Sequence, residues 1–259
     1  MQHSVGYTVL FAAGVCLVCS LFVATTSVLL RGRAAENVLL DKRQKVLVVA
    51  GLLTPGDDLS REETNRLFEK NLVPKLVDLA SGVYADDPAP GAYDQRKAAR
   101  DPERSHEAPA NAAKVRRVPN QGLVYLIKPG DEVEGVIIPV EGLGLWGTLY
   151  GYLALNPDAR TIQGLTFYEH KETPGLGGEV DNPRWKERWK GRLVYDRSGR
   201  PVLNVKKGMA GPPELDPYNV DGLSGATITS RGVGNLVRFW LGKNGFGPYL
   251  KAARIGGHT

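Results

Sequence analysis

The distribution of apolar residues divides the chain into one long apolar run and a larger region in which apolar and polar residues alternate. Residues 5–30 are apolar except for a few serines, threonines, glycines and cysteines. As a helix this run would be about 39 Å long at ~1.5 Å per residue, more than the ~30 Å of a bilayer core. No lysine or arginine precedes it and no A-x-A site follows it, so we predict a retained transmembrane anchor rather than a cleaved signal peptide.

The region after the anchor has a helical pattern that becomes irregular. Residues 34–53 can continue as a helix with an apolar stripe, ended by Pro55 and Gly56. Ser60 and Glu63 form a capping box that predicts a helix over residues 61–72. Residues 85–117 contain few large apolar side chains, which predicts a long loop or a partly disordered insertion.

From residue 122 onward the pattern changes to that of strands. We predict strands at 123–127, 135–139, 148–155 and 161–168, a hairpin of 191–196 with 201–205, and short helices at 184–190 and 231–241. Thr229 or Ser230 would cap the last helix. Because strands and helices do not alternate, we expect an α+β fold: a single N-terminal transmembrane helix followed by a mixed α/β domain with a mainly antiparallel sheet. The expected divisions are an anchor at 1–33, a helical connector with a polar loop insertion at 34–120, and a ligand-binding domain at 121–259.

Charge and cysteine content narrow the function. The net charge is +5, but the basic residues are scattered among 28 acidic ones without a dense cluster, which argues against nucleic-acid binding. The two cysteines, Cys16 and Cys19, lie in the apolar run with no further ligand nearby, so we predict no metal site. The chain has no G-x-G-x-x-G after a strand, so it should not oxidise NADH by itself, and we predict no catalytic residue.

The most informative run is residues 221–230, which reads Asp-Gly-Leu-Ser-Gly-Ala-Thr-Ile-Thr-Ser. It places hydroxyl groups in a loop of small residues that a bulky reactant can approach closely. A helix follows it, and the N-terminus of a helix binds phosphate well. The run is therefore suited to hold a phosphate, including one joined to Thr227. The alternative interpretation of so short a motif is a turn and a helix cap.

Three other segments could surround a flat ligand. Trp146 lies in a glycine-rich turn and could stack on a ring, or it could be a core residue at a bend. Residues 170–178 offer Glu172 and Thr173 before a glycine-rich loop, which could equally be an ordinary proline turn. Lys207 could balance a phosphate or belong to a solvated basic pair.

These segments, in this order after one N-terminal span, resemble the C subunit of the sodium-translocating NADH:quinone reductase. The resemblance is carried by the Asp-x-x-Ser-Gly-Ala-Thr motif that ends at Thr227, by Glu-Thr-Pro-Gly-Leu-Gly at 172–177, by Gly-Leu-Trp at 144–146 with Gly-Tyr-Leu at 151–153, and by residues 37–47 and 50–51 after the span. The segment after the span distinguishes this family from the related G subunit of the Rnf complex, which shares the flavin motifs.

The resemblance implies a covalent cofactor, FMN, attached through its phosphate to Thr227, with Thr229 as the fallback acceptor. It implies a phosphate loop and a flavin surround formed by Asp221, Ser224, Gly225, Ala226, Trp146, Glu172, Thr173, Leu176, Gly177 and Lys207. A separate flavin transferase would attach the FMN part of FAD with the help of magnesium.

The implied role is electron transfer within a six-subunit complex that oxidises NADH, reduces ubiquinone and pumps sodium ions out of the cell. The B, D and E subunits would be the main partners. The resemblance implies a single-pass protein of the bacterial inner membrane with its bulk domain in the periplasm. The positive-inside rule, applied to the five basic residues at positions 31–45, would instead place that domain in the cytoplasm, and we prefer the topology of the family. The alternatives are an Rnf-type G subunit, a membrane-anchored flavin-binding sensor or assembly protein, and a structural anchor without a cofactor.

Overall fold

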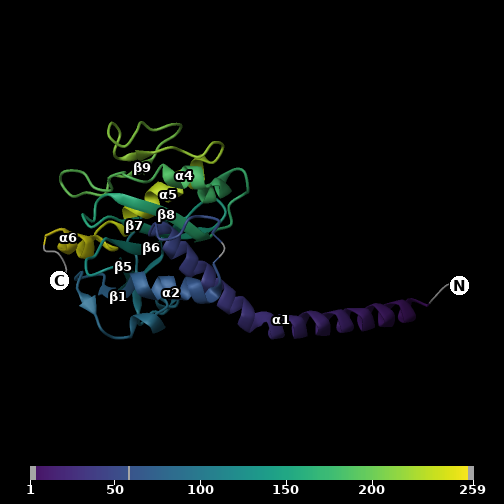
Figure 1. Cartoon of the computed structure of the whole chain (residues 1–259). Helices are drawn as coiled ribbons and strands as arrows, with labels where there is room; N and C mark the ends of the chain where they lie inside the picture. The colour runs from purple at the N-terminus through teal and green to yellow at the C-terminus, as the bar shows by residue number, and fades with distance from the viewer. Residues whose placement is uncertain (1–3, 58, 256–259) are drawn as a thin grey trace. The chain divides into compact units, whose positions relative to one another are not determined.

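A computed structural model describes residues 4–57 and 59–255 of the chain. Internal contacts divide the chain into two units, residues 1–42 and 43–259 (Figure 1). Helix α1 (Val5–Val49) begins in the first unit and ends in the second. The two predicted helical stretches after residue 5 are therefore one uninterrupted helix.

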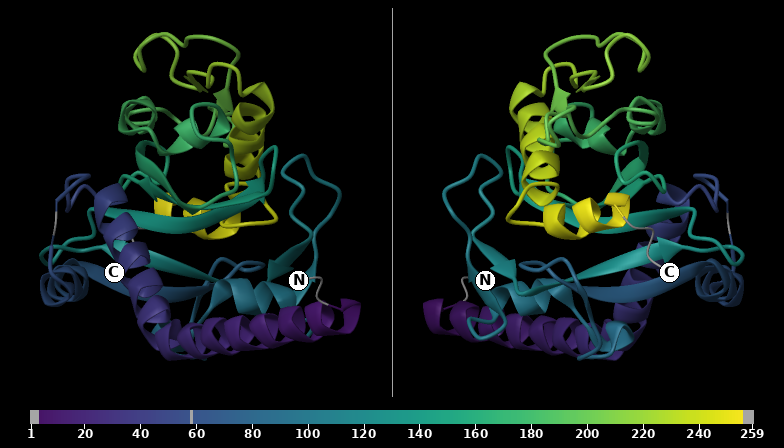
Figure 2. Two further views of the ribbon diagram at one scale, coloured as in Figure 1. Left: turned by 90° about the vertical axis from the view of Figure 1, so that its right-hand side faces the viewer. Right: turned by 90° about the vertical axis from the view of Figure 1, so that its left-hand side faces the viewer.

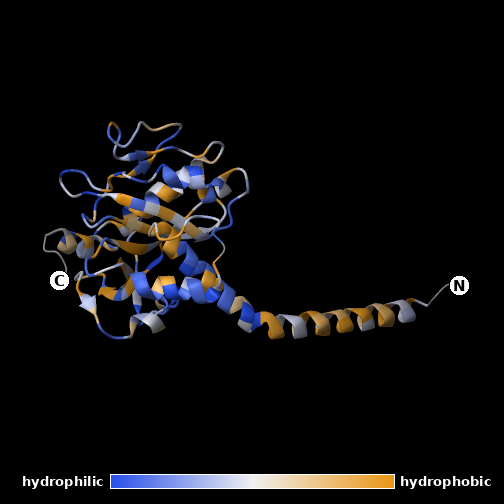
Figure 3. Cartoon of the chain, viewed as in Figure 1, coloured by the Kyte–Doolittle hydropathy of each residue, from blue (hydrophilic) through white to orange (hydrophobic). Residues whose placement is uncertain are grey.

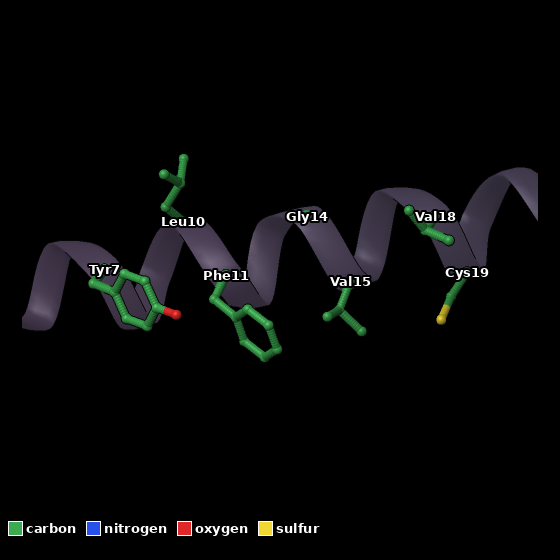
Figure 4. A pocket seen from close by; sticks show the side chains of 7 residues that line it. All are labelled: Tyr7, Leu10, Phe11, Gly14, Val15, Val18 and Cys19. Carbon is green, nitrogen blue, oxygen red and sulfur yellow. The ribbon is translucent and has the colours of Figure 1, made fainter. Parts of the chain in front are cut away.

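The first unit is the long apolar part of α1. Its most apolar window has a mean hydropathy of 2.3 and contains no buried residue, so the helix is long and apolar enough to cross a membrane. Figure 3 shows the change from apolar to polar residues along it. One apolar strip is lined by side chains spaced three or four residues apart, which places them on the same face (Figure 4): Tyr7, Leu10, Phe11, Gly14, Val15, Val18 and Cys19.

Helix α1 ends four residues earlier than predicted, and the cause is local. Gly51 adopts a φ of +71°, which favours glycine because other side chains are strained there. Its N–H donates to the carbonyl of Val48, and the N–H of Leu52 donates to the carbonyl of Leu47. This is the Schellman arrangement, which satisfies the last carbonyls of a helix.

A six-stranded sheet organises the second unit. Its order is β2 (Tyr84–Ala85), β1 (Leu72–Asp78), β5 (Gln121–Ile127), β6 (Gly135–Leu143), β7 (Thr148–Leu155) and β8 (Ile162–Glu169), and every neighbouring pair is antiparallel. The four strands predicted between residues 123 and 168 are confirmed, and so is the α+β class. The sequence interpretation missed β1, whose residues follow directly on helix α2 (Arg61–Asn71). The sheet therefore draws strands from both sides of the boundary expected at residue 120.

The sheet buries both of its faces because successive side chains on a strand point in opposite directions. On one face Ile138 and Leu153 pack in a cluster with helices α5 (Thr227–Trp240) and α6 (Gly247–Ile255). On the other face Ile137 packs with the end of α1 and with Phe68 of α2. Figure 2 shows α5 and α6 in yellow tones on their side of the sheet. Each large apolar side chain buried in this way contributes about 1.5–3 kcal/mol. The capping box predicted for α2 is also present.

The prediction of a long loop over residues 85–117 is only partly correct, because short elements interrupt the irregular stretches. This segment contains η1 (Pro90–Ala92), α3 (Gln95–Arg100), β3 (Ser105–Glu107) and the first residue of β4 (Arg117–Pro119). Asp94 caps α3 by accepting hydrogen bonds from two backbone N–H groups. Tyr93 and Ala98 are buried against Leu76 of the sheet. A few apolar residues are enough here because each is placed to cover the part of the sheet next to β1.

The hairpin predicted at 191–205 is confirmed only next to its turn. There Tyr195 and Pro201 form an antiparallel bridge, the N–H of Val202 donates to the carbonyl of Val194, and the N–H of Asp196 donates to the carbonyl of Arg200. Leu193 bridges Thr161 instead, and proline cannot donate to a ladder. The second arm ends in β9 (Asn204–Val205), which pairs in parallel with β10 (Asn219–Val220). The predicted helix at 184–190 is present as the shorter α4 (Pro183–Glu187), which follows η2 (Gly177–Asp181).

Candidate functional site

The start of α5 differs from the prediction in a way that defines the site. The helix begins at Thr227 with Ala226 as its N-cap, so Thr229 and Ser230 are not the cap but lie buried in the first turn. The Ser230 hydroxyl accepts a hydrogen bond from the backbone N–H of Leu223 at 2.9 Å. That bond folds the preceding loop back onto the helix and leaves Thr227 at the first helical position.

The two candidate hydroxyl groups have opposite environments. The Thr227 side chain is exposed, whereas Thr229 is 0% exposed and donates a hydrogen bond to Glu172. The first N–H groups of a helix have no partner within the helix, and they carry a partial positive charge. Thr227 therefore presents a hydroxyl beside donors that favour an anion such as phosphate. Ser224 and Gly225, just before it, are exposed as well.

Glu172 is the buried centre of the site rather than part of its surface. The side chain is 5% exposed. One carboxylate oxygen accepts hydrogen bonds from the backbone N–H groups of Leu145 and Trp146, both at 3.0 Å, and the other accepts from the Thr229 hydroxyl. The carboxylate thus joins the β6–β7 turn, its own loop and the first turn of α5.

The glycines around this carboxylate are required by its close approach. A Cβ on Gly144 or on Gly177 would lie 2.5 Å from one of the Glu172 oxygens, which is closer than real contacts allow. This gives a structural reason for glycine at the predicted site residue Gly177, which is buried. Its role is to let the loop and the carboxylate pack together.

Exposed apolar side chains surround the start of α5. Trp146 is 65% exposed, Leu176 is 46% exposed and Ile228 is 54% exposed. Leu176 lies against Gly225, since a Cβ added there would be 2.9 Å from its Cδ2. These side chains come from the segments that Glu172 joins, so the site offers both apolar contacts and a helix N-terminus. Ile228 was missed from sequence, although an apolar residue directly after the motif threonine is the signal that could have found it.

The other predicted site residues lie in the loops around the start of α5. The Asp221 carboxylate accepts a hydrogen bond from the N–H of Ala210 at 2.7 Å and lies 3.6 Å from Arg188, so it holds the neighbouring loop. Lys207 is exposed in that loop. The side chain of Thr173 is exposed too, and its carbonyl accepts from the N–H groups of Leu176 and Gly178 and closes the loop.

A cluster of charged side chains stabilises the loop that carries Glu172. Asp181 lies 2.8 Å from the Nε2 atom of His170 and 3.1 Å from the Nζ atom of Lys186. Burial alone would raise the pKa of Asp181, but Lys186 and His170 outweigh it, so that the pKa lies below its ordinary value. The cluster fixes the end of β8 against η2. In the described part of the chain no group of three or more His, Cys, Asp or Glu side chains could hold a metal ion.

Comparisons with known proteins agree with this geometry. The family model of the FMN-binding domain matches residues 144–242, which include the β6–β7 turn, the Glu172 loop and α5. The crystal structure of NqrC from Shewanella oneidensis is similar, with a TM-score of 0.76 and 34% identity over 83% of this chain and 99% of that one. The C subunit of the Na(+)-translocating NADH-quinone reductase from Parabacteroides distasonis has a TM-score of 0.66 and 28% identity, covering 85% of this chain and 96% of that one.

Curated relatives match over nearly the full length. The C subunit of the Na(+)-translocating NADH-quinone reductase of Pseudomonas aeruginosa is 46% identical over 258 residues, covering 98% of each chain. The same protein of Vibrio vulnificus is 44% identical and covers 99% of this chain and 98% of its own. These matches favour the sodium-translocating reductase over an Rnf-type complex. The chain belongs to the family formed by the C subunits of Na(+)-translocating NADH-quinone reductases, with an FMN-binding domain at residues 144–242.

Proposed function

We propose that this subunit carries FMN covalently, through a phosphoester to the Thr227 hydroxyl, and relays electrons within its membrane complex. The observation that supports this most directly is the contrast between the two threonines: Thr227 is exposed at a helix N-terminus and Thr229 is buried under Glu172. Only an exposed hydroxyl can reach a second enzyme that delivers the cofactor.

Attachment would be a phosphoryl transfer from FAD, catalysed by a flavin transferase with magnesium. The Thr227 oxygen forms a bond to the phosphorus that carries riboflavin, the pyrophosphate bond breaks, and AMP leaves. The hydroxyl proton passes to a base of the transferase or to water. No electrons are exchanged in this step. The N–H groups at the start of α5 would stabilise the phosphate both before and after transfer.

The residues present fit the cofactor. Trp146 and Leu176 would contact the flat ring system, and the helix N-terminus would bind the phosphate. Glu172 would act indirectly, by holding the turn of Trp146 against α5. FMN supplies the one- and two-electron redox chemistry when bound, and the protein's part is to position it and to shield one side of it. Lys207 would add positive charge near the loop.

Membership of the family supports a proposal about the partners and the topology. We propose that the protein works with the B, D and E subunits of a complex that oxidises NADH, reduces ubiquinone and exports sodium ions. Helix α1 would anchor it in the bacterial inner membrane, and residues from about 43 onward would lie in the periplasm. Other subunits of that complex would supply the site that oxidises NADH.

Intact mass spectrometry tests the attachment. We expect the chain co-expressed with a flavin transferase to be heavier than the polypeptide by one FMN less one water, and to be unmodified when it is expressed alone. The same preparation should be yellow and should lose its colour on reduction. An unmodified chain under conditions in which an established substrate of the transferase is flavinylated would contradict the proposal.

Cysteine labelling tests the topology. We expect Arg197→Cys, in a background with Cys16 and Cys19 replaced by alanine, to react with a membrane-impermeant maleimide in cells whose outer membrane alone is permeabilised. Arg197 is exposed in the second unit, so its accessibility depends on the compartment. Labelling that requires lysis of the inner membrane would place the domain in the cytoplasm, as the charge pattern suggests.

A further inference from the structure

A second pocket, of about 550 Å³, lies beside the turn end of the β6–β7 hairpin, between that hairpin and the segment that was predicted to be a loop. Its volume is in the range typical of sites for small ligands. Five of its twelve lining residues are basic and one is acidic: Arg96, Arg100, Lys114, Arg116, Arg117 and Glu141. The proposed flavin site does not use any of them.

Two of the arginines are held in place. Both terminal nitrogens of Arg96 contact the carboxylate of Glu169, at 2.5 and 3.2 Å, and its guanidinium carbon lies 3.7 Å from the ring centroid of Tyr150. Arg117 donates to the hydroxyl and the carbonyl oxygen of Ser105, at 2.8 and 2.7 Å. These two side chains therefore form a fixed part of the pocket wall.

The turn that carries the other cations is also held in place. The Asn111 side chain accepts a hydrogen bond from the N–H of Val115 at 3.1 Å and donates to its carbonyl at 2.8 Å. Ala113 and Val115 are buried, and they alternate with Lys114 and Arg116, which are exposed. The two cationic side chains are therefore directed away from the core.

The positive charge of the pocket is only partly neutralised by the protein. In the described residues Arg100, Lys114 and Arg116 have no carboxylate within the 4 Å of an ion pair, and the charge of Arg96 is balanced by Glu169. Burial raises the pKa of Glu141, against the opposing effect of Arg96 and Arg100. A pocket of this kind attracts anions, and arginine forks match the oxygens of phosphate.

We propose that this pocket binds a small organic phosphate, with the phosphate held by Arg100, Lys114 and Arg116 and the uncharged part against Leu143 and Tyr150. Three cations without an ion pair match a phosphate dianion better than they match a chloride ion. The volume leaves room for more than a phosphate group, and the apolar side chains supply a surface for the remainder. The pocket shares no lining residue with the proposed FMN site, although Leu143 and Thr148 flank the turn that carries Trp146.

Calorimetric titration of the purified full-length chain in detergent tests this, with pyrophosphate and phenyl phosphate as probes. We expect saturable one-to-one binding that weakens at high salt, because screening acts on exposed charges. Arg100→Gln should weaken binding about tenfold or more, since one charge-assisted hydrogen bond is lost. The matched control is Lys97→Gln, on the same helix α3 but outside the pocket, which should change the affinity less than about twofold.

A variant that gains affinity guards against effects of misfolding. Glu141→Gln removes the one negative charge that lines the pocket and should tighten binding several-fold. Thr227→Val should leave the affinity unchanged, which separates this pocket from the proposed attachment site. No saturable binding of either probe, an equal loss in Lys97→Gln and Arg100→Gln, or weaker binding in Glu141→Gln would each overturn the proposal.

Discussion

Thr227→Ala is expected to abolish the covalent FMN completely, with no modified fraction left in the intact mass spectrum. The physical reason is the absence of a substitute hydroxyl at the same position. Thr229 is only two residues away, but its hydroxyl is buried and engaged with Glu172, so a transferase cannot reach it. Because Thr227 is exposed, its replacement should change the free energy of unfolding by less than about 0.5 kcal/mol.

Two matched variants complete this experiment. Thr227→Val keeps the branched shape without the hydroxyl and should also lack FMN. Thr229→Val removes the buried hydroxyl and should retain FMN on Thr227, at some cost in stability because Glu172 loses a partner. FMN on the Thr227→Ala chain, followed by its loss in Thr229→Val, would show that the acceptor is the buried threonine and that the site opens during modification.

The fold was predictable where the signal is local. The apolar run, the Ser60 capping box and four strands each follow from a period or a spacing within about ten residues. Strand β1 was missed because its residues follow α2 without a break and include Pro74, which argues against a strand. Pro74 is tolerated although β1 is an inner strand, since its neighbour β2 extends over only two residues.

The segment at 85–117 shows why composition alone can mislead. Its content of large apolar side chains is low, which is typical of disorder. The residues that decide its structure are Tyr93 and Ala98, which pack on Leu76, a residue distant in the chain. A short stretch of sequence cannot reveal this contact because the residues are far apart in the chain. The pocket beside the β6–β7 hairpin could not be predicted for the same reason, since its cations lie on two separate stretches of this segment.

The candidate site was predictable as chemistry but not as geometry. The motif around Thr227 indicated an exposed hydroxyl near a helix, and the structure places it there. The helix start was predicted too late because Thr229 and Ser230 are good capping residues, yet tertiary contacts use both hydroxyls inside the first turn. Glu172 was predicted as a ligand contact, and this stays a prediction; the structure shows a buried carboxylate that connects three segments. The sequence shows that Glu172 lies near glycines, but its connecting role can be recognised only from the residues that it contacts in the fold.

Glu172→Ala is expected to lower the free energy of unfolding by about 3 kcal/mol, because two N–H groups lose a charged acceptor and a buried hydroxyl loses its partner. It should also reduce flavinylation strongly although Thr227 is intact, since the turn of Trp146 is no longer held against α5. Denaturant unfolding of the full-length chain in detergent, followed by tryptophan fluorescence, measures the first effect. Intact mass spectrometry measures the second.

Two comparisons separate a role in positioning from a general loss of stability. Glu172→Gln keeps an acceptor for Leu145 and Trp146 and a donor toward Thr229, so it should retain most of the stability and most of the FMN. Glu187→Ala, at an exposed residue 2.7 Å from Lys190, should cost less than about 0.5 kcal/mol and leave FMN unchanged. If Glu172→Ala is flavinylated as fully as the native chain, the carboxylate stabilises the fold without organising the site. The attachment would then depend on α5 alone.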